Sequence, residues 1–265
     1  MFLGDSLTEG VGSRRISYVT ELAKQLHASE FRLRPIDAVN GYVDFNVAGM
    51  MQPQSSSDLW LWNLACEGKT IESDFEWLPL ISTLRPELIV LFRGSLESII
   101  RPAMLRDGAW PWWVPRSWRN YSAMDPRCYF STTWWRKAKQ TSVDAVKQKA
   151  RLKLLEQRTG EPLMKLDQLA QHQGELLRQL RAIGARVLML GLLPVDDACF
   201  PGSHAYFTLV NAKLKEIAND AGAEFLDWAW SLPPKGTHAE LFYRDSFHPN
   251  EAGSRALAEI LLHAL

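Results

Sequence analysis

The stretch that decides the fold is Met1-Phe2-Leu3-Gly4-Asp5-Ser6-Leu7-Thr8-Glu9-Gly10. Its first three residues are apolar and read as the end of a buried strand, and residues 4–12 read as a turn. Between Ile16 and Ala28 apolar residues recur at helical spacing, which predicts a helix after the turn. The predicted order is therefore strand, tight turn and helix, with Ser6 at the junction.

The same alternation of strands and helices continues along most of the chain. The apolar run at residues 88–92 is typical of a strand buried on both faces. Other strands are predicted at residues 59–62, 186–190 and 224–227, and helices at residues 70–84, 163–183, 206–221 and 251–265. This order implies a single α/β domain over residues 1–265, with a mostly parallel sheet of about five strands covered by helices on both faces.

Two segments interrupt this order. Residues 31–34 and 42–47 alternate apolar and polar side chains and predict a hairpin around Asn40-Gly41. Residues 98–162 begin rich in Trp, Pro and Arg and end charged and helical, so we interpret them as an insertion that forms a lid or cap. The tryptophans of the insertion have three readings, which are the core of an inserted lobe, a flat platform for a sugar ring or acyl chain, and a partner interface.

Composition narrows the classes of function. Lys and Arg together number 30, as do Asp and Glu, so the chain has no net charge that would favour nucleic acid or an anionic membrane. No apolar run reaches the length of a membrane span. The three cysteines are widely spaced and predict neither a disulfide framework nor a metal site. We expect a cytoplasmic protein, with an export segment removed from a longer precursor as the alternative.

Chemistry-bearing residues follow several of the predicted strands. In open parallel sheets, binding sites form beyond the carboxyl ends of the strands. Ser6, Gly68 and Gly94 each follow a predicted strand, and Asp245 and His248 follow the last one. We therefore expect these residues to meet at one edge of the sheet.

Ser6, His248 and Asp245 supply the three parts of a serine nucleophile. A serine hydroxyl attacks well only when a base takes its proton, and the base needs an acceptor that orients it. In Asp245-Ser246-Phe247-His248, an acid and an imidazole stand three residues apart. The sequence thus predicts an acyl-ester hydrolase with Ser6 as nucleophile, His248 as base and Asp245 as its orienting acid.

The chain resembles the GDSL, or SGNH, hydrolase family. Gly4-Asp5-Ser6-Leu7 and Asp245-x-x-His248 match the family's first and last blocks, and Asn63-x-x-x-x-Gly68 resembles its second. The resemblance covers residues 1–15, 59–98 and 163–265 and implies a three-layer α/β/α, flavodoxin-like fold. It also implies that the N–H groups of Ser6 and Gly68 face the developing oxyanion, while Asn63 ties loops together.

The chain departs from the family's third block. The family has Gly-x-Asn-Asp, whose Asn donates to the oxyanion, but Leu96 stands at that position when the block is aligned on Gly94. Ser95 or Arg93 could replace the missing donor, and Arg93 could instead hold an anionic group of the substrate. The sequence does not choose between these two roles.

The expected activity is hydrolysis of a small-molecule or saccharide ester without cofactor or metal. An acyltransferase would use the same acyl-enzyme, and a binding protein on a degenerate hydrolase scaffold is a further alternative that Leu96 favours. Neither the oligomeric state nor the identity of the ester follows from the sequence.

Overall fold

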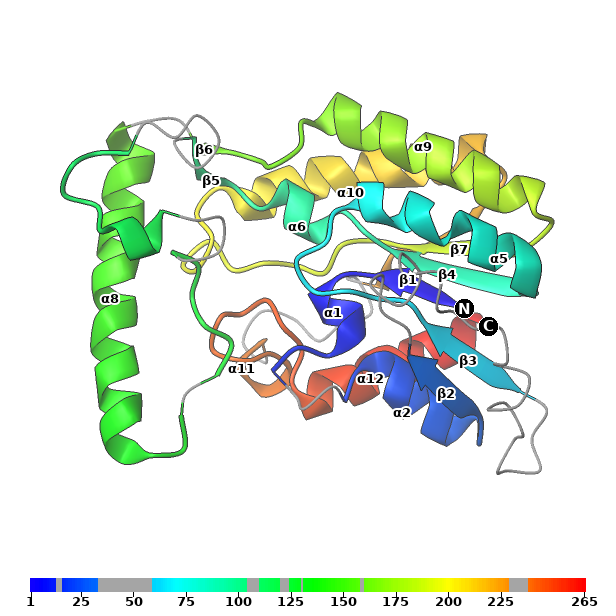
Figure 1. The fold of residues 1–265 in the computed structure, drawn as a ribbon, viewed down its shortest axis with the longest axis horizontal. Coiled ribbons are helices and arrows are strands. Elements are labelled where there is room, and N and C mark those ends of the chain that lie inside the picture. Colours follow the sequence, from blue (N-terminus) through cyan, green and yellow to red (C-terminus); the bar gives the residue numbers. More distant parts are fainter. Residues whose placement is uncertain are drawn as a thin grey trace.

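The structure is a computed structural model that describes residues 1–12, 16–32, 59–103, 110–119, 124–129, 131–157, 160–228 and 238–265. Its centre is a six-stranded sheet in which every neighbouring pair of strands runs parallel (Figure 1). The strand order is β2 (Ser29–Arg32), β3 (Trp60–Asn63), β1 (Phe2–Gly4), β4 (Leu88–Phe92), β7 (Arg186–Leu190) and β8 (Glu224–Leu226). The predicted parallel α/β sheet is confirmed.

The sheet has six strands where about five were expected. The additional strand is β2, in which Phe31 and Arg32 pair in parallel with Trp62 and Asn63 of β3. Short edge strands whose side chains are only half-buried carry a weak periodic signal, which is why the pattern at residues 31–34 was read as half of a hairpin. The predicted turn at Asn40-Gly41 and its second strand at residues 42–47 lie outside the described residues.

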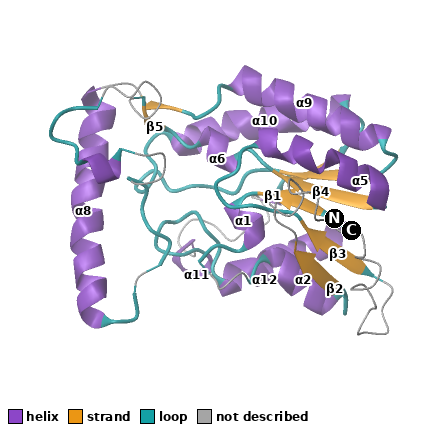
Figure 2. Cartoon of the chain, in the orientation of Figure 1, coloured by secondary structure: helices purple, strands orange, loops and turns teal. Residues whose placement is uncertain are grey.

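Helices cover both faces of the sheet (Figures 1 and 2). Helices α2 (Tyr18–Gln25) and α12 (Glu251–Ala264) pack against each other on one face. The other face carries the 3₁₀ helix η1 (Ile71–Trp77) and the helices α5 (Leu78–Leu84), α9 (Leu166–Ala182) and α10 (Ser203–Asp220). Three short helices, α1 (Ser6–Glu9), α6 (Ser95–Ser98) and α11 (His238–Leu241), lie in or near the loops that follow the strands.

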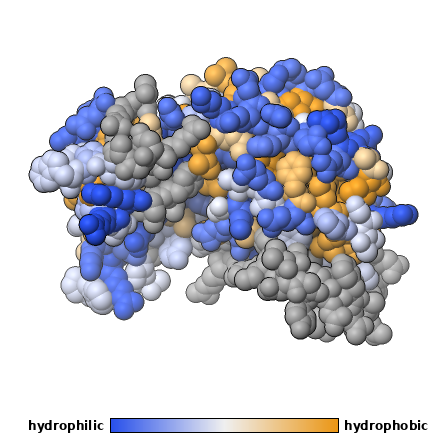
Figure 3. Space-filling model, turned by 45° about the horizontal axis from the view of Figure 1, so that its top comes forward, coloured by the Kyte–Doolittle hydropathy of each residue, from blue (hydrophilic) through white to orange (hydrophobic). Residues whose placement is uncertain are grey.

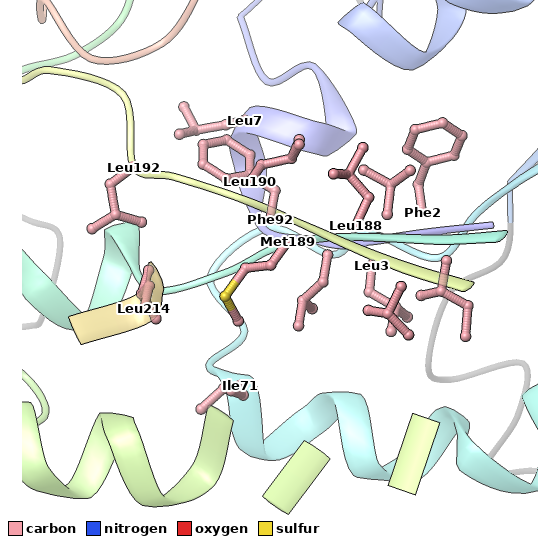
Figure 4. Packing of buried hydrophobic residues seen from close by; sticks show 14 of the residues in the cluster. Phe2, Leu3, Leu7, Ile71, Phe92, Leu188, Met189, Leu190, Leu192 and Leu214 are labelled. Carbon is pink, nitrogen blue, oxygen red and sulfur yellow. The ribbon is translucent and has the colours of Figure 1, made fainter. Parts of the chain in front are cut away.

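The core lies on both sides of the sheet because successive strand side chains point to opposite faces. Figure 4 shows Phe2 and Leu188 on the face covered by α1 and α2, and Leu3 and Met189 on the face covered by α5 and α9. All four side chains are at most 3% exposed. This double burial explains why β1, β4 and β7 read as continuous apolar runs.

The described part of residues 98–162, which the sequence predicts to be an insertion, forms a small lobe with its own core. Its two ends are joined by the antiparallel strands β5 (Arg101–Pro102) and β6 (Gly160–Glu161), and it carries η2 (Arg116–Trp118) and the long helix α8 (Trp134–Gln157). Val114, Met124 and Leu154 are buried together, and Trp110, Trp113 and Trp118 pack around them. Three other tryptophans are exposed, namely Trp112 (91%), Trp134 (80%) and Trp135 (50%). Core packing therefore accounts for part of the Trp cluster.

The lobe stands beside the carboxyl edge of the sheet. Figure 1 shows α8 on the side toward which β1 runs into α1, beyond α11 and the loop that precedes α12. The buried guanidinium of Arg151 attaches α8 to the sheet domain by donating to the carbonyl oxygen of Cys199 at 2.8 Å. None of the described helices is both long enough and apolar enough to cross a membrane.

Candidate active site

The turn that carries Ser6 is held by its neighbours. Asp5 Oδ1 accepts a hydrogen bond from the N–H of Leu7 at 2.9 Å and caps α1, and Gly10 ends that helix with φ of 83°. A side chain at Gly4 would place its Cβ 2.1 Å from Oγ1 of Thr8, so only glycine fits there. These constraints place Ser6 directly beyond the carboxyl end of β1, as the sequence predicted.

A compact loop carries the acid and the imidazole. Asp245 Oδ1 accepts the backbone N–H groups of Phe247 and His248, both at 3.1 Å, so one carboxylate oxygen builds the loop. Ser246 takes up a positive φ of 52° to make the turn. Phe247 is buried between Phe200 and the imidazole of His248, with ring centroids at 5.7 and 5.0 Å, and fixes the plane of the imidazole.

The second oxygen of Asp245 completes a hydrogen-bonded chain to Ser6. His248 Nδ1 lies 2.6 Å from Asp245 Oδ2, and His248 Nε2 lies 2.9 Å from Ser6 Oγ. An ionised carboxylate only accepts hydrogen bonds, so the imidazole carries its proton on Nδ1 and donates it to Asp245. His248 Nε2 is then the acceptor, and the Ser6 hydroxyl donates to it. This arrangement leaves a lone pair on Nε2 that can remove the serine proton.

The loop after β3 lies against the turn of Ser6. The N–H of Cys66 donates to the carbonyl oxygen of Gly4 at 3.1 Å, and the N–H of Glu67 donates to Glu9 Oε2 at 2.6 Å. Gly68 follows with φ of 69°, is exposed, and would have open space around a side chain. Within the part of the chain that the structure describes, the N–H groups of Ser6 and Gly68 form no hydrogen bond.

Asn63 ties loops together and is not aimed at the site. Its side-chain nitrogen donates to the carbonyl oxygen of Thr8 at 3.3 Å and to Glu30 Oε1 at 3.2 Å, and its oxygen accepts the N–H of Ala65. The amide is 2% exposed. These contacts join the end of β3 to α1 and β2.

Arg93 does not supply an oxyanion donor or a substrate anchor. Its Nε and Nη2 each donate to the Asp74 carboxylate at 2.7 Å, and its Nη1 donates to the carbonyl oxygen of Lys69 at 2.7 Å. Burial alone lowers the pKa of Arg93, but the bidentate Asp74 carboxylate outweighs it and raises that pKa. The guanidinium is thus fully committed inside the protein. The sequence did not predict this pairing of Arg93, because no local pattern identifies Asp74 as its partner.

The remaining residues of the third block are buried beneath the site. Gly94 takes φ of 118° and begins α6 among the apolar side chains of Leu169, Leu192 and Leu214. Ser95 is fully buried, and its hydroxyl has no hydrogen-bond partner among the described residues. Neither contacts Ser6 or His248 through a hydrogen bond that the structure describes.

Glu97, one residue beyond Leu96, is a buried acid. Its Oε1 accepts the N–H of Ile71 at 2.7 Å, while its Oε2 has no partner in the described part of the chain. Burial raises the pKa of Glu97 to about 7, and the nearby charge of Arg93 opposes that rise. Burial likewise raises the pKa of Asp5, the residue before the serine, with Arg93 again opposing.

Sequence reasoning missed two neighbours of the loop at residues 245–248, which we call the triad loop because it carries two of the three candidate triad residues. Cys128, Asp245 and His248 each offer a ligand atom, and these atoms lie within 4.8 Å of one another. Burial, with the charge of Asp245, raises the pKa of Cys128 to about 11, so the thiol stays protonated at neutral pH. Both imidazole nitrogens are already hydrogen-bonded, to Asp245 and to Ser6, so a metal ion could bind His248 only if one of these hydrogen bonds were broken.

The second missed neighbour is an ion pair between Arg244 and Asp144 of α8. Arg244 directly precedes Asp245, so this contact joins the triad loop to the inserted lobe. The two residues lie 100 positions apart, and no local pattern marks them as partners.

One known family matches part of the chain. Residues 133–256 match the sequence model of the GDSL-like Lipase/Acylhydrolase family. The matched segment includes Asp245 and His248 but not the turn of Ser6. No curated protein matches the sequence significantly.

Several solved structures resemble the whole chain. The lipase/acylhydrolase from Enterococcus faecalis is 12% identical with a TM-score of 0.54, covering 99% of this chain and 93% of that chain. The acetyl xylan esterase AlAXEase is 14% identical with a TM-score of 0.54 and full coverage of both chains. Axe2, an acetylxylan esterase from Geobacillus stearothermophilus, is 13% identical with a TM-score of 0.51, covering 99% and 91%. At these identities the likeness establishes a shared fold.

Proposed function

We propose that this chain is an ester hydrolase of the GDSL-like lipase/acylhydrolase type and that it acts through Ser6, His248 and Asp245 and an acyl-enzyme. The observation that carries the proposal is the continuous hydrogen-bonded chain from Ser6 Oγ through His248 to Asp245 Oδ2. A non-catalytic binding protein on a degenerate hydrolase scaffold would not need a serine, a histidine and an aspartate hydrogen-bonded in this order.

The proposed reaction has two steps. Ser6 Oγ attacks the ester carbonyl while His248 Nε2 takes the hydroxyl proton, and the positive charge that forms on the imidazole is stabilised by Asp245. The tetrahedral intermediate collapses, His248 returns the proton to the leaving alcohol, and an acyl group remains on Ser6. Water, activated by His248, then attacks the acyl-enzyme and releases the acid and the serine.

The N–H groups of Ser6 and Gly68 are proposed to stabilise the oxyanion. Two observations support them, since neither is paired within the described residues and the loop of Gly68 is anchored to Gly4 and Glu9 beside the serine turn. Leu96 offers no side-chain donor, and Arg93 is held by Asp74. The oxyanion is therefore proposed to rest on backbone donors alone.

The substrate class is proposed to be a small-molecule or saccharide ester. Three of the tryptophans of the inserted lobe are exposed, and flat aromatic faces suit sugar rings. Two of the structural neighbours described above are named as acetyl xylan esterases. The lobe, which stands beside the carboxyl edge of the sheet and is tied to the triad loop by Arg244 and Asp144, is proposed to act as a lid.

The direct test is the Ser6→Ala variant assayed with p-nitrophenyl acetate. Turnover should fall to the uncatalysed rate while the far-ultraviolet circular dichroism spectrum and the thermal midpoint stay close to those of the wild type. A fluorophosphonate probe should label the wild-type protein at Ser6 alone. Turnover that persists in Ser6→Ala, or labelling of another serine, would contradict the proposal.

A further inference from the structure

A cavity beside the triad loop is lined by positively charged side chains that have no role in the proposed hydrolysis. It has a volume of about 480 Å³ and lies where the first turns of α8 face the chain around residue 127. We call it the basic pocket. It is lined by Arg127, Trp135, Arg136, Lys139, Gln140, Val143 and Asp144.

Helical spacing explains why these side chains share one wall. Arg136, Gln140 and Val143 are four and three residues apart, so they stack along one face of α8. Trp135 and Lys139 are four apart and form the adjacent row. Arg127 belongs to the segment before α8 and also lines the pocket. The pocket is therefore built by two segments.

The charges of the basic pocket do not cancel. Arg127, Arg136 and Lys139 supply three cations, and none of them forms an ion pair with a carboxylate among the residues that the structure describes. The single acid, Asp144, is already paired with Arg244. The Arg136 guanidinium lies 5.0 Å from the centroid of the Trp135 ring, which holds the cation at the flat aromatic face. Figure 3 shows hydrophilic side chains at the α8 end of the molecule, as over much of this face.

The basic pocket is joined to the triad from two directions. Asp144, in its wall, pairs with Arg244, which directly precedes Asp245. Arg127, which also lines the pocket, directly precedes Cys128, and the Cys128 sulfur lies within 4.8 Å of ligand atoms of Asp245 and His248. These two links place the segments that line the pocket next to the loop that carries Asp245 and His248.

We propose that the basic pocket binds an anionic group of the ester substrate, such as a carboxylate, sulfate or phosphate carried on a ring. The three cations recognise the charge, and the half-exposed face of Trp135 packs against the ring. The inference rests on the proposed function, since it names the class of ester that Ser6 acts on. It predicts that the enzyme prefers acetylated acidic saccharides over their neutral counterparts.

The kinetic test compares acetylated galacturonate with acetylated galactose. The two esters differ at C6, which is a carboxylate in the first and a hydroxymethyl group in the second. We expect wild-type kcat/KM to favour the acidic ester at least tenfold at low salt, and 0.5 M NaCl to reduce that preference because salt screens exposed charges. The Arg136→Gln/Lys139→Gln double variant should lower the acidic-to-neutral ratio at least fivefold, mainly through KM. Lys149→Gln, an exposed cation on α8 that does not line the pocket, should leave the ratio unchanged. Equal wild-type rates on both esters would overturn the proposal.

A binding measurement separates this inference from the proposed function. Isothermal titration calorimetry of the Ser6→Ala variant with galacturonate, galactose 6-sulfate, galactose 6-phosphate and galactose should give heat for the acidic sugars only. That binding should be lost in the variant that also carries Arg136→Gln and Lys139→Gln. If the wild type hydrolyses no ester but the acidic sugars still bind in this pattern, the pocket stands and the catalytic proposal fails. If no acidic sugar binds, the basic pocket is not an anion site.

Discussion

Ser6 and His248 are separated by 242 residues in the sequence, yet His248 Nε2 lies 2.9 Å from Ser6 Oγ. Two loops from opposite ends of the chain make this contact. One leaves β1 near the centre of the sheet, and the other precedes α12 and is built around Asp245. Proton transfer needs heavy-atom separations of about 2.6–3.2 Å, so the pair is already within reach before substrate binds.

Asp245→Asn should reduce kcat by on the order of 10³–10⁴ while the protein stays folded. The amide oxygen can still accept the N–H groups of Phe247 and His248, which preserves the loop. The amide NH₂, however, cannot accept the proton of His248 Nδ1, so the imidazole is held in the wrong tautomer. Steady-state rates with p-nitrophenyl acetate and the thermal midpoint check this. A large loss of stability with little loss of rate in the folded fraction would show that Asp245 only builds the loop.

Leu96→Asn should raise kcat, by roughly tenfold or more, if the oxyanion lacks a side-chain donor. Single oxyanion donors are worth about 10²–10³ in rate in enzymes that use them. Leu96→Ala is the matched control, because it shortens the side chain without adding a donor. Rates of both variants should be compared at saturating p-nitrophenyl acetate. If Leu96→Asn is no faster than Leu96→Ala, another group already donates to the oxyanion or the asparagine cannot reach it.

Glu97 should make the stability of the protein depend on pH. Its pKa is raised from 4.5 to about 7 in the folded state, so folding favours the protonated acid. Between these two values the folded protein binds more protons than the unfolded chain, and the free energy of unfolding therefore falls as pH rises. The loss should approach the order of 3 kcal/mol by pH 8.

Glu97→Gln should remove this pH dependence, because the amide stays neutral and its oxygen can still accept the N–H of Ile71. Urea unfolding curves of the wild type and the variant between pH 4 and pH 8 give the difference. Glu87→Gln, which changes an exposed acid that follows α5, should behave like the wild type. A constant difference between wild type and Glu97→Gln across this range would mean that Glu97 does not titrate there.

Gly4→Ala should destabilise the protein and disturb Ser6. The new Cβ would lie 2.1 Å from Oγ1 of the buried Thr8, and moving Thr8 would break its 3.0 Å hydrogen bond with the Tyr18 hydroxyl. Overpacking of this kind costs about 1–3 kcal/mol. Urea unfolding and esterase rates measure the two effects.

Gly174→Ala in α9 is the matched control for Gly4→Ala. A Cβ at Gly174 meets its nearest neighbour, Cγ2 of Ile217, at an ordinary 3.5 Å. Alanine is a better helix former than glycine by about 1 kcal/mol, so this change should leave stability unchanged or slightly higher. If Gly4→Ala were as stable and as active as Gly174→Ala, the turn of Ser6 would be able to accommodate a Cβ at position 4, and the prediction would be wrong.

The sequence alone determined most of the secondary-structure elements and the candidate site residues near the two ends of the chain. The spacing of apolar residues predicted the parallel sheet, most of its helices and the turn of Ser6, because burial on one or both faces imposes a period that can be read locally. The fixed three-residue spacing of Asp245 and His248 also sufficed to pair them, since a single loop holds both. The same reasoning missed β2, whose short edge position leaves its side chains half-buried.

Only the tertiary structure decided which charged residues, distant in the sequence, form ion pairs with each other. Arg93 directly precedes Gly94 of the third block and is a sequence candidate for the oxyanion or for an anion of the substrate, but Asp74, on a neighbouring element, accepts its Nε and Nη2, and the carbonyl oxygen of Lys69 accepts its Nη1. The pairing of Arg244 with Asp144, which ties the inserted lobe to the triad loop, spans 100 residues. Such contacts depend on which surfaces meet when the helices pack on the sheet, and a local sequence pattern contains no information about that meeting.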